Sequence, residues 1–260
     1  MNEKITIIKV GGNIIDDVER LALFLQEFNT INGKKILVHG GGKLATELAK
    51  QLQIPQEMVD GRRITSAETL KVVTMVYAGL INKNIVSRLN ALGSKSIGIT
   101  GADGLSILAH KRKHATIDYG FVGDVDAVNN NFLLQLLDQG LSVVVAPITQ
   151  DEQGQLLNTN ADTIAQELAK ALAKTENVTL IYSFEKKGVL LDVLDDESVI
   201  KRIDKGYYQT LKEKKAIVDG MIPKLDNAFQ AIEAGVSKVI IGDALHLHEL
   251  MEEKSGTVLC

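Results

Sequence analysis

The chain has 260 residues, 45% of them hydrophobic and 24% charged, which is typical of a globular protein with one large domain or two fused lobes. Its 29 basic and 33 acidic residues are interspersed and give a net charge of −4, so the sequence lacks the basic stripe that would bind nucleic acid or an anionic membrane. The single cysteine, Cys260, excludes an intrachain disulfide and a thiolate metal site.

The amino-terminal segment predicts a strand instead of a targeting signal. Met1 leads through polar residues into the apolar run Ile5–Val10, without the charged leader and apolar region of a signal peptide. The longest apolar run, Val143–Ile148, is far shorter than the roughly 20 residues that cross a bilayer. We therefore expect a cytoplasmic protein that binds small molecules or other proteins, and neither nucleic acid nor membranes.

Short runs rich in β-branched residues alternate along the chain with segments of helical period. The runs are almost continuously apolar, as in strands that helices cover on both faces. This alternation predicts an α/β fold, a three-layer α/β/α sandwich around a mostly parallel sheet. The predicted strands are Ile5–Val10, Lys35–Val38, Ser96–Thr100, Ser142–Ala146, Val178–Tyr182 and Lys238–Ile241.

Three predicted helices begin at polar motifs. Residues 65–68, Thr-Ser-Ala-Glu, form a capping box that starts the first helix. The second begins at about Ala161, and the third follows Pro223 and ends at Gly235. Their apolar stripes are Leu70, Val73, Val76 and Leu80 in the first, Ile164, Leu168 and Leu172 in the second, and Leu225, Ala228 and Ile232 in the third.

Polar stretches at 149–155 and 175–177 predict loops. A new strand follows the second loop directly, so we expect a lobe boundary near residue 175. The charge-rich segment Glu185–Asp204 predicts a small hairpin or excursion.

Two predicted strands end in glycines. The first carries Lys9 at its carboxyl end and is followed at once by Gly11 and Gly12, a turn whose N–H groups can approach a phosphate while the ammonium faces it. The second ends in His39 and the triple glycine 40–42 ahead of a helix, where exposed N–H groups form an anion cradle. Both turns therefore indicate binding of phosphate or carboxylate groups.

Two common phosphate motifs are excluded. A P-loop needs Ser or Thr after Gly42-Lys43, and the chain has Leu44. The dinucleotide pattern needs a third glycine where Ala45 stands. A P-loop NTPase and an ordinary Rossmann dehydrogenase both fail these patterns.

Polar side chains also gather at the predicted helix starts. Arg62 and Arg63 precede the first helix; one could bind a substrate carboxylate through its guanidinium fork, or both could be surface charges. Asn158, Asn160 and Asp162 lie within five positions at the start of the second helix, more polar groups than a cap requires. These two motifs are candidate substrate sites.

Lys224 lies in the first turn of the third predicted helix, where the helix dipole disfavours a cation. A bound phosphate would turn this local conflict into an attraction, so Lys224 is a candidate site residue. The five histidines show no metal-ligand spacing, and we expect no metal site in the protein itself.

Taken in order, the motifs at 9–12, 39–42, 60–65, 158–162 and 220–224 resemble those of the acetylglutamate kinases over essentially the whole chain. The arginine motif and Asn-Thr-Asn-Ala-Asp favour these kinases over other members of the amino acid kinase family. The resemblance implies a sheet of about eight strands, a lobe at 1–175 that binds N-acylglutamate and forms a homodimer, and a lobe at 176–260 that binds ATP. It also implies the short type without arginine feedback, because the first strand begins within five residues of Met1.

The resemblance implies transfer of phosphate from ATP, bound with Mg²⁺, to the γ-carboxylate of N-acetyl-L-glutamate in arginine biosynthesis. A carboxylate with a pKa near 4.3 is ionised at pH 7, so the reaction needs alignment and charge stabilisation instead of a general base. The carried-over roles are catalytic for Lys9, Lys224 and Asp162, substrate-binding for Gly41, Gly42, Arg63, Asn158 and Asn160, and nucleotide-binding for Gly11, Gly12, Ser183, Gly188 and Met221.

Two departures from the resembled pattern leave alternatives open. Ser183 is followed by Phe-Glu where Asp-Val is common, and Arg62 replaces the usual leucine. Arg62, Lys186 or Lys187 could bind the extra carboxylate of N-succinyl-L-glutamate, which is the alternative substrate. A non-catalytic amino-acid sensor on the same fold is the second alternative, and the presence of both lysines and Asp162 argues against it.

Overall fold

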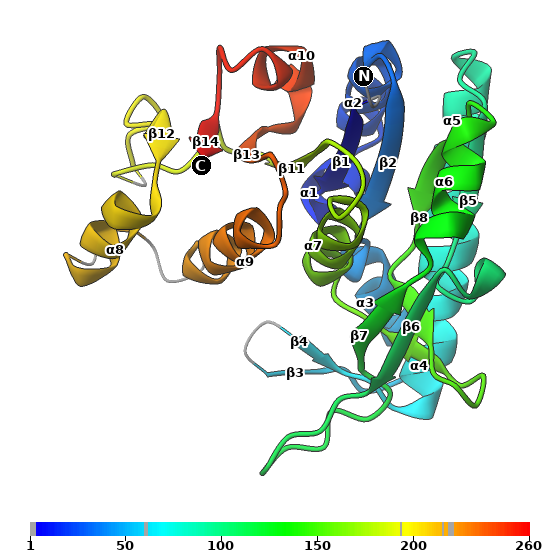
Figure 1. Cartoon of the computed structure of the whole chain (residues 1–260). Coiled ribbons are helices and arrows are strands. Elements are labelled where there is room, and N and C mark those ends of the chain that lie inside the picture. Colours follow the sequence, from blue (N-terminus) through cyan, green and yellow to red (C-terminus); the bar gives the residue numbers. More distant parts are fainter. Residues whose placement is uncertain (1–3, 60–61, 193, 215, 218–220) are drawn as a thin grey trace. The chain divides into compact units, whose positions relative to one another are not determined.

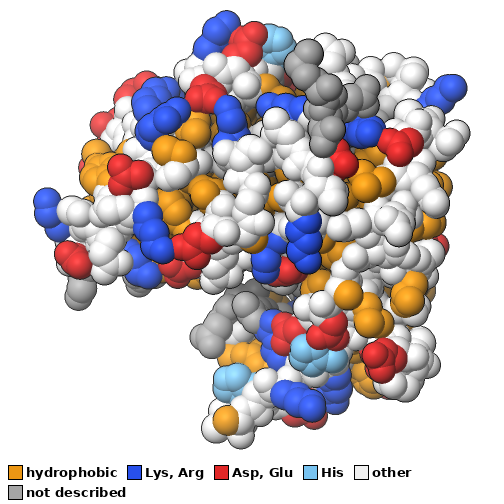
Figure 2. All heavy atoms as spheres, viewed as in Figure 1, with side chains coloured by type: hydrophobic (Ala, Val, Ile, Leu, Met, Phe, Trp, Pro, Cys, Tyr) orange, Lys and Arg blue, Asp and Glu red, His pale blue; other side chains and the backbone are white. Residues whose placement is uncertain are grey.

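A computed structural model describes residues 4–59, 62–192, 194–214, 216–217 and 221–260. Eight of its strands form one mostly parallel sheet in the order β12-β14-β13-β11-β1-β2-β8-β5, and helices lie between them in the sequence (Figure 1). The predicted α/β class with a sheet of eight strands is confirmed. Basic and acidic side chains are mixed over the face drawn in Figure 2.

The chain divides into two compact units, and unit 1 combines both ends of the sequence, Met1–Lys35 and Ala165–Cys260. Its strands are β1 (Ile5–Val10), β11 (Val178–Phe184), β12 (Arg202–Ile203), β13 (Lys238–Asp243) and β14 (Thr257–Leu259). β11 pairs in parallel with β1 and β13, and β14 runs antiparallel to β13. The helices are α1 (Gly12–Ile15), α2 (Val18–Thr30), α8 (Lys205–Glu213), α9 (Ile222–Glu233), η3 (Ala244–His246) and α10 (Leu247–Met251).

Unit 2 is the continuous segment Ile36–Ile164. It holds most of β2 (Lys34–His39) together with β5 (Ser96–Ile99) and β8 (Ser142–Val145), and these three strands of the large sheet are parallel. A second sheet, β10-β9-β6-β7, comprises β6 (Ile107–Lys111), β7 (Gly123–Val128), β9 (Ile148–Gln150) and β10 (Leu156–Asn158), and β3 (Glu57–Val59) pairs with β4 (Arg62–Ile64). The helices are α3 (Gly42–Gln51), α4 (Ala67–Thr74), η1 (Met75–Ile81), α5 (Asn82–Ala91), η2 (Asp103–Leu105) and α6 (Asn130–Asp138), while α7 (Ala161–Leu172) spans the division.

All six predicted strands are confirmed, and so are the helices α7 and α9. The stripe of α7, Ile164, Leu168 and Leu172, is fully buried. α9 ends at Glu233 with Ala234 as its C-cap, after which Gly235 adopts φ +102°, a conformation that glycine allows and that commonly ends a helix. Local periodicity and capping signals were sufficient for these elements.

The first predicted helix required two corrections. Its cap is Ser66, whose hydroxyl accepts the N–H of Thr69, so the cap lies one residue later than the predicted box. Leu80 was predicted on the buried stripe but is 59% exposed, and Tyr77 and Ile81 are buried instead. The cause is η1, a π-helical segment between α4 and α5, because its wider turns move later residues off the α-helical period.

The segment 149–155, predicted as a loop, begins inside β9 and ends just before β10. These strands have only three residues each, too few for a periodic signal. The boundaries between the two compact units fall after residues 35 and 164, whereas the predicted lobe boundary lies near residue 175. β1 and α2 therefore belong to the same compact unit as the carboxyl-terminal third of the chain.

Candidate active site

The predicted residues fall into two groups, one in each unit. Unit 2 carries the triple-glycine turn between β2 and α3. Gly41 adopts φ +146°, and a Cβ there would lie 2.1 Å from Ile81 Cδ1, so this position accepts only glycine. The first N–H groups of a helix have no intrahelical partners, so the start of α3 offers donors to an anion, and anion binding there stays a prediction.

Arg63 lies on β4 with 9% of its surface exposed. Its Nη2 donates to the carbonyl oxygen of Gly42 at 3.0 Å and to Thr46 Oγ1 at 2.9 Å, and its Nη1 donates to Gln56 Oε1. At least three of the five guanidinium N–H groups are thus held within unit 2, which fixes the plane of the cation. The structure brings Arg63 to the glycine turn, as a substrate site there would require.

Sequence analysis missed Thr46 and Gln56, which are isolated polar residues without any motif. A second pair comes from distant segments: Asn158, at the end of β10, donates from Nδ2 to Thr65 Oγ1 at 3.0 Å. Thr65 directly precedes the capped helix. Asp60 and Gly61 lie outside the described residues, as does the side chain of Arg62.

Asn160 and Asp162 lie at the start of α7. Asn160 Oδ1 accepts the N–H of Thr163 at 3.1 Å, so this side chain caps the helix. Asp162 is in the first turn, and its Oδ1 is buried. Capping therefore accounts for Asn160 in this structure, and its substrate contact stays a prediction.

The second group surrounds the end of β11 in unit 1. Ser183 Oγ donates to the carbonyl oxygen of Lys9 at 3.0 Å, and the N–H of Gly11 donates to the carbonyl oxygen of Ser183 at 3.0 Å. Lys224, in the first turn of α9, has its Nζ 4.8 Å from the ring centroid of Phe184. Lys9, Gly11, Ser183 and Lys224 are thus linked through one strand end, although they come from three elements and one turn. Phe184 had no sequence signal.

A small cavity of about 60 Å³ adjoins this strand end. Its lining is mainly apolar and includes two of the predicted nucleotide-binding residues, Gly188 and Met221. A Cβ at Gly188 would lie 2.8 Å from Thr257 Oγ1, so glycine is also needed here for packing. The lining residues are Phe184, Lys186, Gly188, Val189, Leu190, Ile217 and Met221. Asp219 and Gly220 lie outside the described residues.

The titration behaviour of His39 follows from its burial. The side chain is fully buried, and desolvation lowers its pKa from 6.5 to about 4. His39 is therefore neutral at pH 7, and the glycine turn receives no charge from it.

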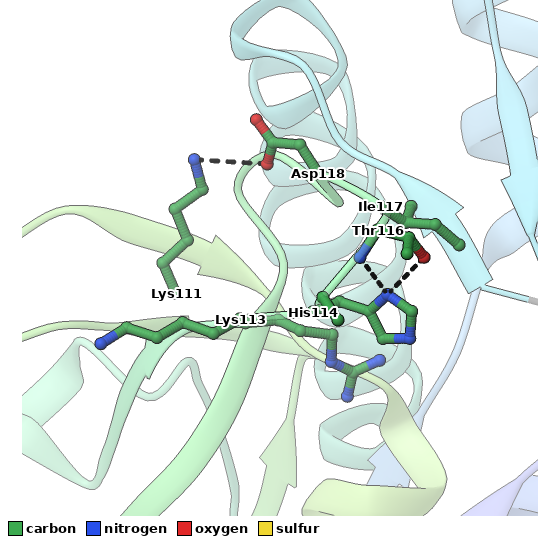
Figure 3. A pocket seen from close by; sticks show the side chains of 8 residues that line it. Lys111, Lys113, His114, Thr116, Ile117 and Asp118 are labelled. Atoms are coloured by element: carbon green, nitrogen blue, oxygen red, sulfur yellow. Dashed lines mark hydrogen bonds and ion pairs between the residues drawn. The ribbon is translucent and has the colours of Figure 1, made fainter.

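A larger depression, about 470 Å³, lies on the loop after β6 (Figure 3). Lys111 Nζ is 3.6 Å from Asp118 Oδ1, while Lys113 points away from both. None of the predicted site residues line it. In the described part of the chain, no group of three or more His, Cys, Asp or Glu side chains could hold a metal ion, and no helix is long and apolar enough to cross a bilayer.

The chain is similar to several known proteins over nearly its whole length. A protein of Parabacteroides distasonis named acetylglutamate kinase is 58% identical to this chain, over 95% of this chain and 97% of the relative. A protein of the same name from Phocaeicola vulgatus is 56% identical, over 100% of this chain and 99% of the relative. The solved structure of smu.665 from Streptococcus mutans is 28% identical, covers 98% of both chains and superposes with a TM-score of 0.80. Residues 4–243 match the Amino acid kinase family. The chain therefore belongs to the amino acid kinase family.

Proposed function

We propose that the chain transfers the γ-phosphoryl group of ATP to the γ-carboxylate of N-acetyl-L-glutamate, releasing ADP and N-acetylglutamyl 5-phosphate in the second step of arginine biosynthesis. The near full-length similarity to proteins named acetylglutamate kinase supports this substrate. A carboxylate oxygen attacks the γ-phosphorus as the bond to the β,γ-bridging oxygen breaks. The nucleophile is already ionised at pH 7, so no proton has to be removed.

Substrate binding is assigned to the group in unit 2. Arg63 would bind the α-carboxylate, since its guanidinium is buried, fixed in plane and always charged. The N–H groups of Gly41 and Gly42 would bind the reacting carboxylate at the start of α3. Asn158, with Asn160, would contact the acyl group.

Phosphoryl transfer is assigned to the group in unit 1 together with Asp162, a residue of unit 2. Lys9 and Lys224 would neutralise the charge on the transferring group, Asp162 would orient the two ammonium groups, and the amides of Gly11 and Gly12 would contact phosphate oxygens. Ser183, Gly188 and Met221 would contact the nucleotide. The donor set of glycine amides and lysines suits a polyphosphate, and Mg²⁺ carried by ATP would supply further charge neutralisation.

The observation that carries the proposal is the hydrogen bond from Arg63 to the carbonyl oxygen of Gly42, which puts a carboxylate-binding cation beside an anion-binding turn. ADP release should be measured with magnesium-ATP and either N-acetyl-L-glutamate or N-succinyl-L-glutamate, with L-glutamate as the control. The acetyl substrate is expected to give the highest kcat/KM. A higher kcat/KM with the succinyl compound would make N-succinyl-L-glutamate the substrate. Absence of turnover with both compounds would favour the non-catalytic amino-acid sensor.

The proposal also includes a cytoplasmic homodimer whose contact lies in the lobe at 1–175, with the nucleotide bound by the lobe at 176–260. Met75 and Leu80 support the contact, because these large apolar side chains are 53% and 59% exposed on η1. A contiguous apolar patch is typical of a surface that binds another protein, and the two side chains lie on the same π-helical segment.

A further inference from the structure

A buried polar network lies behind the triple-glycine turn. His39 Nδ1 is 2.8 Å from the carbonyl oxygen of Gly40, and its Nε2 is 3.2 Å from Nδ2 of Asn82. Asn82 Nδ2 also donates to the carbonyl oxygen of Val144 at 3.0 Å, and Asn82 Oδ1 accepts from Lys83 Nζ at 3.1 Å. His39 and Asn82 are both at least 99% buried, being 0% and 1% exposed.

These contacts fix every donor and acceptor in the network. A backbone carbonyl can only accept, so the Asn82 atom beside Val144 is the amide nitrogen. That nitrogen can only donate, so Nε2 of His39 accepts and the imidazole proton is on Nδ1. Nδ1–H therefore donates to the carbonyl oxygen of Gly40. A neutral imidazole with one defined tautomer satisfies all of these bonds.

We propose that Asn82 and His39 are positioning residues that set the orientation of the Gly40–Gly41 peptide for substrate binding. In a trans peptide the C=O and the N–H point in opposite directions. A Gly40 carbonyl held towards His39 therefore turns the N–H of Gly41 away from the imidazole. Asn82 acts through His39 by holding the tautomer that donates to Gly40. The inference rests on the proposed function, in which that N–H binds the reacting carboxylate.

The surrounding backbone is shaped to hold this network. A Cβ at Gly98 on β5 would lie 1.9 Å from Asn82 Oδ1, so glycine at this position makes room for the amide. Lys83 Nζ also connects α5 to β5, because it donates to the carbonyl oxygen of Gly98 at 2.8 Å. A side chain at position 98 would therefore displace Asn82 from the network.

The π-helical segment contacts the turn from the same side. Tyr77 and Ile81, both in η1, leave no space for a side chain at Gly41, and Asn82 follows directly after Ile81. The widened helix thus brings an apolar contact and the amide of Asn82 to one short turn. A continuous α-helix would rotate Ile81 and Asn82 relative to Tyr77 and lose one of these contacts.

The test compares Asn82→Ala with Asn84→Ala, an exposed asparagine two residues later on α5. We expect the first variant to raise KM for the acylglutamate by roughly 5- to 10-fold, the size of one lost orienting hydrogen bond, with a smaller change in kcat and none in KM for ATP. The second variant should behave as the wild type. Equal KM values in both variants would overturn the inference.

The amide resonances of Gly41 and Gly42 give a readout that needs no substrate. In Asn82→Ala these resonances should shift, while Asn84→Ala leaves them in place. Wild type that turns over no acylglutamate would refute the proposed function, whereas unshifted glycine resonances would refute the positioning role alone.

A second variant, Asn82→Asp, keeps the shape of the side chain if the alanine variant does not fold. It replaces the donor with an acceptor that faces Nε2 of His39 and the Val144 carbonyl. Besides burial, the positive charge of Lys83 lowers the pKa of His39 in the wild-type structure. The Asp variant should bind acylglutamate better at pH 6 than at pH 8, because a protonated imidazole can donate to both Gly40 and the new carboxylate. A pH-independent KM equal to that of wild type would contradict the inference.

Discussion

Lys224 and Phe184 form a cation–π contact, with the ammonium nitrogen 4.8 Å from the ring centroid. The contact joins the first turn of α9 to the end of β11, where Ser183 and Gly11 are hydrogen-bonded. An ammonium group over an aromatic face is attracted electrostatically by the ring quadrupole. Phe184 thus gives Lys224 a defined position although the helix dipole opposes a cation there.

Replacing Lys224 by alanine should lower kcat by roughly 10²- to 10³-fold, the usual cost of removing one group that stabilises charge in the transition state. KM for either substrate should change less, because the ammonium acts mainly on the transferring group. Steady-state kinetics with a coupled assay for ADP measure both constants. Lys205→Ala, at a lysine on α8 with a 77% exposed side chain, is the matched control, and an unchanged kcat in Lys224→Ala would remove this residue from catalysis.

Arg63→Ala should raise KM for the acylglutamate by roughly 10- to 100-fold, since it removes charge-assisted hydrogen bonds to a carboxylate. KM for ATP should stay near the wild-type value. Arg88→Ala, on α5, provides the control for loss of a cation. If Arg63→Ala bound acylglutamate normally in calorimetry, the carboxylate clamp would have to lie elsewhere.

The buried imidazole of His39 should make stability depend on pH. Its pKa is lowered to about 4, below the 6.5 of an exposed histidine, so the unfolded chain binds more protons between these values. The resulting stability is present above pH 6.5 and is lost as pH falls towards 4, by an amount on the order of 3 kcal/mol. Thermal unfolding between pH 4.5 and 7.5 should show a shallower acid slope for His39→Gln than for wild type. Parallel slopes would show that the imidazole does not remain neutral in the folded state.

Leu80→Lys should dissociate the proposed homodimer, because a lysine would place a charge within an apolar contact. Sedimentation velocity at micromolar protein would then give a monomer, while Leu194→Lys, at a 96% exposed leucine, keeps the dimer. A dimer that survives Leu80→Lys would indicate another contact surface.

The sequence predicted those features that local patterns determine. The strand that carries Lys9 near its end, the turn at Gly41 and the helix beginning beside Lys224 all follow from apolar runs, glycines and helix-end chemistry. Leu80 was assigned wrongly because a π-helical segment leaves no mark in an apolar stripe. The partners of Arg63 could not be predicted, since Thr46 and Gln56 reach it only through tertiary packing.

The pairing of β1 with β11 has a consequence for biosynthesis. Ile5 lies opposite Val178, so the ribosome must add about 170 residues after β1 before its partner emerges, which takes roughly 10 to 30 seconds at ordinary elongation rates. During that time the edge of β1 that later meets β11 stays open on every nascent chain. Such an apolar edge is a binding site for chaperones and a starting point for aggregation, so soluble yield in a recombinant host should depend on how quickly the last third of the chain is translated.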